Sequence, residues 1–286
     1  MDGNDLRQRL STGEPVLMPG VWDALTSRLT AQAGFDTVFL SGYCTSATLL
    51  GLPDFGYLTQ TEMVEVARRV CRAAPELMVV VDADTGYGNP LNTIRTVELW
   101  EEAGATGLFL EDQVWPKKCG HMAGKEVVPR GDWLAKVKAA VESKEHLFIT
   151  ARTDARAAVG LDEAIERAKA AADLGVDAVF VEAPESIAEM ELIAAALPDQ
   201  VRVANMIEAG KTPLLTPSEL HELGFDLIVS PLSSLFTVAR SVADTLALLK
   251  DEGTLRNHLD RLVSFDEFGE IVDLDAHYAT EQRYPT

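Results

Sequence analysis

Three carboxylates end two short apolar runs in the first half of the chain. Asp82 and Asp84 follow the run 78–81, and Glu111 follows the run 107–110. Side chains alternate along a strand, so Asp82 and Asp84 are expected on one face. Three adjacent carboxylates without a counter-ion would raise one another's pKa, and a bound Mg²⁺ or Mn²⁺ would relieve the repulsion. The alternative is that one or two of them only cap helices or pair with Arg152.

A second group of reactive side chains lies in the segment 116–121, which reads Pro-Lys-Lys-Cys-Gly-His. A thiol flanked by cations and an imidazole can be held as a thiolate or can deliver a proton. Lys117, Cys119 and His121 are therefore candidate catalytic residues. The glycine-containing, helix-free setting is typical of a mobile lid over a substrate. The alternative is a solvated basic loop with an incidental cysteine.

Eight short apolar runs alternate with eight segments of helical periodicity. The runs cover 16–18, 37–40, 78–81, 107–110, 147–150, 178–181, 201–204 and 227–229, and the helical segments cover 23–33, 60–74, 91–103, 131–144, 161–174, 187–197, 217–223 and 233–250. Gly34, Gly104, Gly175 and Gly224 each follow a helix just before the next run, as C′ glycines do. Eight such units predict an α/β fold, a (β/α)8 TIM barrel, over an open doubly wound sheet.

Nearly every predicted strand ends in polar residues. The ends of seven strands carry Ser41 and Gly42, Asp82 and Asp84, Glu111 and Asp112, Arg152, Thr153 and Asp154, Glu182, Asn205, and Ser230. The carboxyl ends of barrel strands share one rim, where the active sites of such barrels lie. The sequence therefore predicts one active site at this rim.

The barrel pattern stops near Gly253. We expect a catalytic barrel domain over residues 1–252 and a C-terminal helical extension over residues 253–286. Exposed Phe265, Phe268 and Tyr278 would be unfavourable in a monomer, so the extension is predicted to pack on a neighbouring subunit.

The composition of the chain limits the classes of molecule that the protein is expected to bind. The 286 residues carry a formal charge of -20 and no basic stripe, which opposes nucleic-acid binding. No apolar run approaches the ~20 residues that span a bilayer. Cys44, Cys71 and Cys119 are too few and too widely spaced for a disulfide framework or CxxC zinc chemistry. We expect a soluble, cytoplasmic protein that binds a small anionic molecule and neither nucleic acid nor membranes.

Taken together, these motifs resemble those of the isocitrate lyase/phosphoenolpyruvate mutase superfamily between about residues 19 and 253. The resemblance is carried by the stretches 40–42, 51–54, 82–89 (Asp-Ala-Asp-Thr-Gly-Tyr-Gly-Asn), 110–113, 117–121, 151–154 and 204–206. It implies a barrel whose last helix is swapped between subunits, in a homotetramer built as a dimer of dimers.

The resemblance also implies roles for individual residues. Mg²⁺ would bind near Asp82, Asp84 and Glu111, and the amides of Ser41 and Gly42 would hold the 2-oxo acid end of a small dicarboxylate. Arg152 would bind its carboxylate, and Asp54 would lie on a gating loop. The polar wall would be completed by Glu182 and Asn205, with Tyr43 and Gly120 as adjoining substrate contacts.

Within the superfamily, the Lys-Cys-Gly-His stretch looks like that of the carbon-carbon lyases. Cys119 could then protonate the enediolate-like carboxylate that retro-aldol cleavage leaves. The segment 204–213 is similar to the branch of petal death protein and dimethylmalate lyases, which implies a 2-substituted malate such as 2,3-dimethylmalate, cleaved to a 2-oxo acid and a carboxylic acid. The alternatives are a methylisocitrate lyase, an oxaloacetate hydrolase and a phosphonomutase of the carboxyphosphonoenolpyruvate or phosphoenolpyruvate mutase kind. A non-catalytic scaffold would require a lost metal ligand or lid cysteine, and neither loss is seen.

Overall fold

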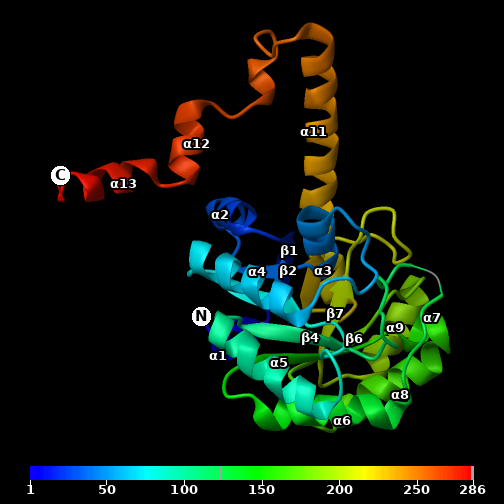
Figure 1. The fold of residues 1–286 in the computed structure, drawn as a ribbon. Coiled ribbons are helices and arrows are strands. Elements are labelled where there is room, and N and C mark those ends of the chain that lie inside the picture. Colours follow the sequence, from blue (N-terminus) through cyan, green and yellow to red (C-terminus); the bar gives the residue numbers. More distant parts are fainter. Residues whose placement is uncertain (123, 285–286) are drawn as a thin grey trace.

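Eight parallel strands close into a barrel in the order in which they occur in the chain (Figure 1). We describe a computed structural model of residues 1–122 and 124–284. The strands are β1 (Val16–Val21), β2 (Thr37–Leu40), β3 (Met78–Asp82), β4 (Gly107–Glu111), β5 (Phe148–Thr153), β6 (Ala178–Val181), β7 (Val201–Asn205) and β8 (Leu227–Ser230). The predicted (β/α)8 TIM barrel and all eight of its strands are confirmed.

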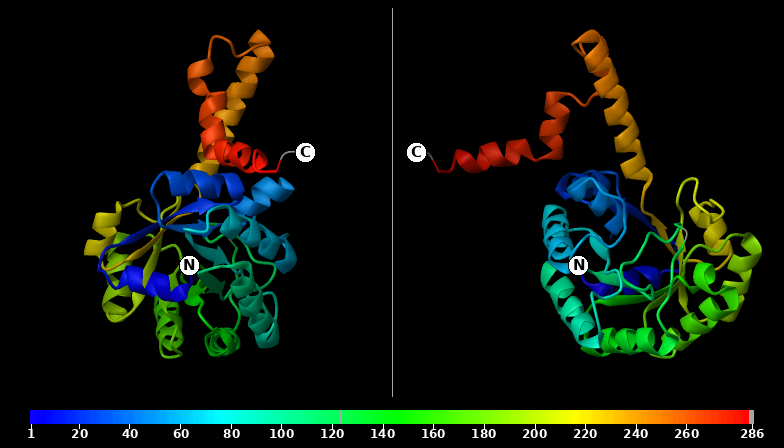
Figure 2. Two further views of the ribbon diagram at one scale, coloured as in Figure 1. Left: turned by 90° about the vertical axis from the view of Figure 1, so that its left-hand side faces the viewer. Right: turned by 45° about the vertical axis from the view of Figure 1, so that its right-hand side comes forward.

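Helices follow the strands and surround the barrel (Figures 1 and 2). They are α2 (Ala24–Gln32), α3 (Gly42–Thr45) continued by the π-helical turn η1 (Ser46–Leu50), α4 (Gln60–Ala73), α5 (Pro90–Ala103), α6 (Arg130–Ser143), α7 (Ala155–Ala158), α8 (Leu161–Ala172), α9 (Ile187–Ala196), α10 (Pro217–Glu222) and α11 (Ser233–Glu252). Gly34, Gly104, Gly175 and Gly224 have φ values of 87, 89, 84 and 87°, respectively. These left-handed conformations confirm that the four glycines end their helices.

The apolar core has two layers. Inside the barrel, side chains such as Phe39, Phe109 and Phe180 pack together, with ring centroids 4.9 Å apart for the first pair and 5.5 Å apart for the second. Between the strands and the helices, a larger cluster includes the fully buried Trp100 and Trp133. Both faces of the strands are therefore buried, which explains why the runs are continuously apolar and do not alternate.

An N-terminal helix that the sequence analysis did not predict, α1 (Gly3–Leu10), packs against β5. Asp2 and Asp5 form its capping box. Leu6 is fully buried in the inner core, and Arg7 pairs with Asp177 at 2.6 Å. The helix is short and mostly polar, so its single buried leucine gave a weak periodic signal.

The C-terminal segment extends away from the barrel as an arm. Helix α11 projects outward, and η2 (Leu259–Arg261), α12 (Phe265–Ile271) and α13 (Leu274–Glu281) continue from it (Figures 1 and 2). Helix α11 ends at Glu252 and is followed by the C-cap residue Gly253, and the division of the chain near this residue stays a prediction. Of the extension 253–286, the last two residues lie outside the described part of the chain.

Side chains of the arm are largely exposed. Phe265 is 87% exposed, and Tyr278 is 53% exposed. Arg28 of α2 ties the arm to the barrel, because its guanidinium pairs with Asp273 and donates to the carbonyl of Ile271. No helix within residues 1–122 and 124–284 is long and apolar enough to cross a membrane.

Candidate active site

A cavity of about 40 Å³ lies at the carboxyl ends of the strands and collects most of the predicted site residues. Its lining includes Ser41, Tyr43, Asp54, Asp82, Lys117, Cys119, Gly120, Arg152, Glu182 and Asn205. Gly42, Asp84, Glu111 and His121 contact these residues from immediately behind the lining. The structure thus brings the predicted residues together at the rim, as expected for a barrel.

Lys117 is the counter-ion of the carboxylates on one side of the cavity. Its ammonium lies 2.7 Å from Oδ1 of Asp84, 3.0 Å from Oδ2 of Asp54 and 3.7 Å from Oδ2 of Asp82. Burial lowers the pKa of Lys117, but the carboxylates outweigh it and hold that pKa well above its ordinary value. The lysine therefore carries its positive charge in the cavity.

Asp82 and Asp84 do not converge by strand alternation, so that reasoning was wrong. Strand β3 ends at Asp82, and Asp84 lies beyond it in a left-handed conformation with φ of 47°. The backbone N–H of Asp84 donates to Oδ1 of Asp82 at 3.1 Å. The sharp turn after the strand brings the two carboxylates to the same lysine.

Glu111 ends β4 behind the cavity lining and faces Arg152. It is paired in register with Arg152 on β5, and its Oε2 lies 3.4 Å from Nε of that residue. Burial raises the pKa of Glu111 well above its ordinary value, and Arg152 and Lys117 only partly oppose this effect. Pairing with Arg152 was the alternative that the sequence left open for these carboxylates.

The carboxylates have the chemistry of a magnesium site. In the described chain, no three carboxylate, histidine or cysteine side chains enclose a metal position by themselves. However, both carboxylate oxygens of Glu111 are buried there without a hydrogen-bond partner, and burial raises the pKa of Asp84 to about 7 despite Lys117. Lys117 and Arg152 therefore neutralise the carboxylates Asp84 and Glu111 only in part. Mg²⁺ usually takes one or two protein carboxylates and completes its shell with water and substrate, so Asp82, Asp84 and Glu111 fit it.

The segment after β2 lies beside Asp82 and Lys117. Ser41 begins α3, and its side chain accepts a hydrogen bond from the N–H of Cys44 at 3.3 Å. A Cβ atom on Gly42 would lie 2.8 Å from Oδ2 of Asp82, so a side chain at this position would displace that carboxylate. Cys44 is fully buried and its thiol lies 3.1 Å from the carbonyl of Pro231, which makes it a packing residue.

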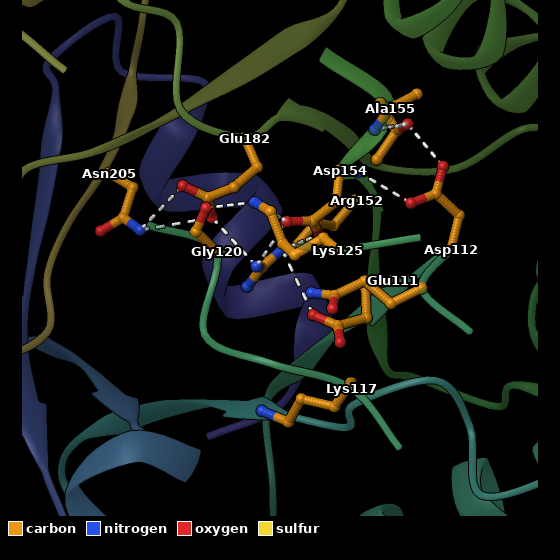
Figure 3. A network of polar contacts seen from close by, with 12 residues as sticks. Glu111, Asp112, Lys117, Gly120, Lys125, Arg152, Asp154, Ala155, Glu182 and Asn205 are labelled. Atoms are coloured by element: carbon orange, nitrogen blue, oxygen red, sulfur yellow. Dashed lines mark hydrogen bonds and ion pairs between the residues drawn. The ribbon is translucent and has the colours of Figure 1, made fainter. Parts of the chain in front are cut away.

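Arg152 is the centre of the polar network on the far side of the cavity (Figure 3). Its Nε donates to Oδ2 of Asp154 at 3.0 Å, and its Nη2 lies 3.2 Å from Oε2 of Glu182. The guanidinium also lies over the ring of Phe180, 5.3 Å from the centroid. These contacts fix a buried planar cation at the cavity wall, a suitable partner for a substrate carboxylate.

Glu182 orients two further side chains. Nδ2 of Asn205 donates to both its oxygens at 3.3 Å, and Nε2 of His121 lies 3.1 Å from Oε1 (Figure 3 shows the first pair). Burial would raise the pKa of Glu182, but Arg152 and His121 outweigh it and lower that pKa to about 2. Nδ1 of His121 accepts from the N–H of Lys211 at 3.0 Å, so the ring proton lies on Nε2.

Cys119 lies in the loop that follows β4. We call residues 113–122 and 124–127 the lid loop; Gln113 and Val127 form a bridge at its base. The backbone N–H of Cys119 donates to the carbonyl of Asp54 at 3.3 Å, which joins the lid loop to the loop that carries Asp54. Burial raises the pKa of the Cys119 thiol to about 11. Of the two states considered from the sequence, this environment favours the protonated thiol. Movement of the lid loop stays a prediction.

Behind the cavity lie two carboxylates to which the sequence analysis gave no individual role and one lysine that it missed. Asp154 holds Arg152, and its backbone N–H donates to Oδ1 of Asp112 at 2.7 Å. Lys125 of the lid loop donates to Oδ1 of Asp154 at 2.7 Å (Figure 3). Asp112 and Asp154 stand in the polar strand ends, which was the available signal, whereas Lys125 has no such position.

Comparison with known proteins identifies the family. Residues 6–250 match the family model described as phosphoenolpyruvate phosphomutase. The chain is 50% identical over 271 residues to petal death protein of Dianthus caryophyllus, covering 94% of this chain and 85% of that protein. It is 42% identical over 283 residues to 2,3-dimethylmalate lyase of Eubacterium barkeri, covering 98% and 97%. It is also 49% identical over 274 residues to the chloroplastic carboxyvinyl-carboxyphosphonate phosphorylmutase of Arabidopsis thaliana, covering 94% and 80%.

Solved structures give the same assignment. Oxaloacetate acetylhydrolase in complex with 3,3-difluorooxalacetate superposes with a TM-score of 0.93 at 32% identity, covering 98% of this chain and 96% of that one. Phosphonopyruvate hydrolase in complex with oxalate and Mg²⁺ superposes with a TM-score of 0.88 at 25% identity, covering 99% of each chain. The chain, a closed barrel with its polar residues gathered at one rim, therefore belongs to the phosphoenolpyruvate mutase/isocitrate lyase superfamily, and it is a lyase or mutase of that superfamily.

Proposed function

We propose that this protein is a Mg²⁺-dependent carbon-carbon lyase that cleaves a 2-substituted malate, with 2,3-dimethylmalate as the preferred candidate, to a 2-oxo acid and a carboxylic acid. The observation that carries the proposal is the place of Cys119. Its protonated thiol lines the same small cavity as Arg152 and Asn205, where a carbon acid could be protonated. The identity to 2,3-dimethylmalate lyase over nearly the whole of both chains supports this substrate class.

Each group of the cavity has a task in this reaction. Arg152 binds one substrate carboxylate, and the backbone at Ser41 and Gly42 holds the end that becomes the 2-oxo acid. Magnesium held by Asp82, Asp84 and Glu111 would supply positive charge where the 2-oxygen gains negative charge.

Bond cleavage moves two protons and one electron pair. The 2-hydroxyl proton passes to solvent water as the 2-oxo group forms, and the bond between C2 and C3 breaks with its electron pair on C3. The thiol of Cys119 donates its proton to C3. Solvent later returns a proton to the thiolate that Cys119 becomes, so the proton count balances. For 2,3-dimethylmalate the products are pyruvate and propionate.

Proton NMR tests the substrate assignment. The purified protein is incubated with Mg²⁺ and, separately, with 2,3-dimethylmalate, methylisocitrate, isocitrate, oxaloacetate and phosphonopyruvate, each with and without a chelator. Chelator-sensitive release of pyruvate and propionate from dimethylmalate is expected. Turnover of oxaloacetate alone would replace the lyase by a hydrolase, and turnover of phosphonopyruvate alone would replace it by phosphorus-carbon chemistry, the reaction class suggested by the phosphorylmutase relative.

The arm is proposed to pack on a second copy of the chain, within a homotetramer. Helix α11 leaves its own barrel, and its side chains Val242 and Leu246 are 51% and 57% exposed. A cavity of about 500 Å³ on the barrel wall, lined by Leu17, Trp22 and Leu29 among others, lies beside the base of α11. An exposed apolar helix and an apolar groove on the same chain are complementary in the way that a helix exchange between copies requires.

Light scattering during size-exclusion chromatography tests the assembly. The wild-type mass is expected near four times the 31.0 kDa of one chain. Leu246→Asp should reduce the mass, whereas Leu91→Asp, an exposed position on α5, should leave it unchanged. A wild-type mass of one chain would reject the exchange.

A cytoplasmic location is also part of the proposal, because the free thiols Cys44, Cys71 and Cys119 are typical of a reducing compartment.

A further inference from the structure

Lys125 is a buried lysine of the lid loop that does not line the catalytic cavity. Its side chain is 1% exposed, and its ammonium donates to Oδ1 of Asp154 at 2.7 Å. The same ammonium donates to the carbonyl oxygen of Gly120. Lysine is almost never fully buried unless it is paired, and burying a lysine in a loop costs free energy that must be offset by its contacts. These contacts join the lid loop to a single carboxylate of the barrel.

Asp154 is anchored to the barrel independently of the lid loop. Its backbone N–H donates to Asp112, which in turn accepts from Nη1 of Arg167 at 3.1 Å. Its carboxylate also accepts from Nε and Nη2 of Arg152, at 3.0 and 3.3 Å. Lys125 and Arg152 therefore share one fixed carboxylate, as Figure 3 shows.

The lid loop also contacts Arg152 and Glu182, through Gly120 and His121. A Cβ atom on Gly120 would lie 2.6 Å from Nη2 of Arg152 and 2.5 Å from Cδ of Glu182, so the glycine backbone is in close contact with both. Nε2 of His121 lies 3.1 Å from Glu182. Fixing the Gly120 carbonyl thus fixes the segment that carries Cys119.

We propose that Lys125 is a latch, a positioning residue that holds the lid loop closed by bridging the Gly120 carbonyl and Asp154. Closure through Lys125 places Cys119 over the cavity. It also brings a second cation to the carboxylate of Asp154, so less of that negative charge neutralises Arg152 and the guanidinium attracts an anionic substrate more strongly. This second effect rests on the proposed function, which assigns a substrate carboxylate to Arg152. The latch itself does not.

The rate at which iodoacetamide alkylates Cys119 reports on the latch without any substrate. The full-length wild type is compared at one pH with Lys125→Met and with Lys118→Met. Lys118 is the matched control, because its ammonium bonds to the carbonyl of Gly124 in the same loop and, among residues 1–122 and 124–284, to no carboxylate. Peptide mass spectrometry separates Cys119 from Cys71, and Cys71 reports any general opening of the fold.

Lys125→Met is expected to accelerate alkylation of Cys119 by roughly tenfold or more, because the loop loses its buried ion pair with Asp154 and its bond to the Gly120 carbonyl. Lys118→Met should stay within about twofold of the wild type, as surface substitutions do. Loss of a nearby cation would favour the neutral thiol and slow alkylation, so acceleration reports opening. Equal rates for Cys119 in the wild type and in folded Lys125→Met would overturn the latch.

Two additions keep the test decisive. If Lys125→Met does not fold, Lys125→Gln replaces it, because glutamine retains a hydrogen-bond donor. The same acceleration is expected, since the charge that pairs with Asp154 is lost. Oxalate, the ligand in structures of two relatives, is then titrated as a probe. It should protect Cys119 of the wild type at lower concentration than it protects the Lys125 variant. Lack of turnover with every acid, combined with a clear alkylation response, would reject the lyase and retain the latch.

Discussion

The ammonium of Lys117 lies 2.7 Å from Oδ1 of Asp84, so a lysine of the lid loop is the nearest cation to a carboxylate of the candidate magnesium site. On the other side of the cavity, Arg152 forms ion pairs with Glu111 and Glu182. The cavity therefore has two cationic halves. One is delivered by the lid loop, and the other is built into β5.

Lys117→Met should lower kcat/KM by roughly 100-fold or more, because the cavity would lose a buried cation and leave Asp54 and Asp84 without their counter-charge. Steady-state kinetics with the substrate identified by NMR measures the effect. The neighbouring Lys118→Met removes the same charge from a lysine that pairs with no carboxylate in the described part of the chain, and it should remain near wild type. Similar losses in the two variants would contradict the role of Lys117.

Cys119→Ser should reduce kcat by roughly 10²–10⁴-fold, since a hydroxyl is a much weaker acid than a thiol and proton donation contributes a factor of this size. KM should change little, because the exchange is nearly isosteric. Cys71→Ser on α4 is the control. Retention of most of the turnover in folded Cys119→Ser would remove the thiol from the reaction and favour phosphorus-carbon chemistry.

The alkylation rate of Cys119 should rise with pH toward an apparent pKa of about 11, because burial disfavours the thiolate. A raised pKa means that the thiol stays protonated through neutral pH, as a proton donor requires. The same protein in urea should instead follow the ordinary thiol pKa near 9.0. A plateau already reached at neutral pH in the folded protein would indicate a resting thiolate.

Asp177→Asn should lower the free energy of unfolding by about 2 kcal/mol at neutral pH, since the carboxylate is only partly exposed. Asp177 lies 2.6 Å from Nε of Arg7 and 2.6 Å from Nζ of Lys144, and it accepts from the N–H of Ile149 at 2.8 Å. It therefore joins α1 to the barrel. Urea unfolding measures the loss.

The pH dependence of this loss follows from the pKa. Burial would raise the pKa of Asp177, but the hydrogen bonds from Arg7 and Lys144 outweigh it and lower that pKa below 3.8. The stabilisation is therefore complete above the unfolded pKa and disappears as the pH falls through the lower folded pKa. The difference between the wild type and Asp177→Asn should shrink below about pH 4. Asp173→Asn, at the exposed end of α8, should change stability by less than about 0.5 kcal/mol. A difference that grows in acid would contradict the assignment.

Much of the barrel could be predicted because its strands are buried on both faces and its helices end at glycines. Continuous apolar runs and left-handed C′ positions such as Gly104 leave a strong local signal. Helix α1 could not be found in this way, since only Leu6 and Gly3 are buried among its polar residues. Its place depends on a long-range pair, Arg7 with Asp177.

The candidate site was predictable where its residues end strands, as Glu111, Arg152 and Glu182 do. Pairings within it were not, because they depend on how the lid loop folds over the rim. Lys117 was expected beside the thiol and is found among the carboxylates of Asp54 and Asp84. Lys125 and Asp154 are 29 residues apart, and no regular spacing in the sequence indicates that such a pair is in contact.

Cleavage of 2,3-dimethylmalate in D₂O, followed by NMR, tests the central claim most directly. The wild type with Mg²⁺ should give pyruvate and propionate in equal amounts, and the propionate should carry one deuterium at C2, because the thiol of Cys119 exchanges with solvent before it donates. Folded Cys119→Ser should form both products far more slowly. Intact dimethylmalate after prolonged incubation of folded, Mg²⁺-loaded wild-type protein would contradict the account.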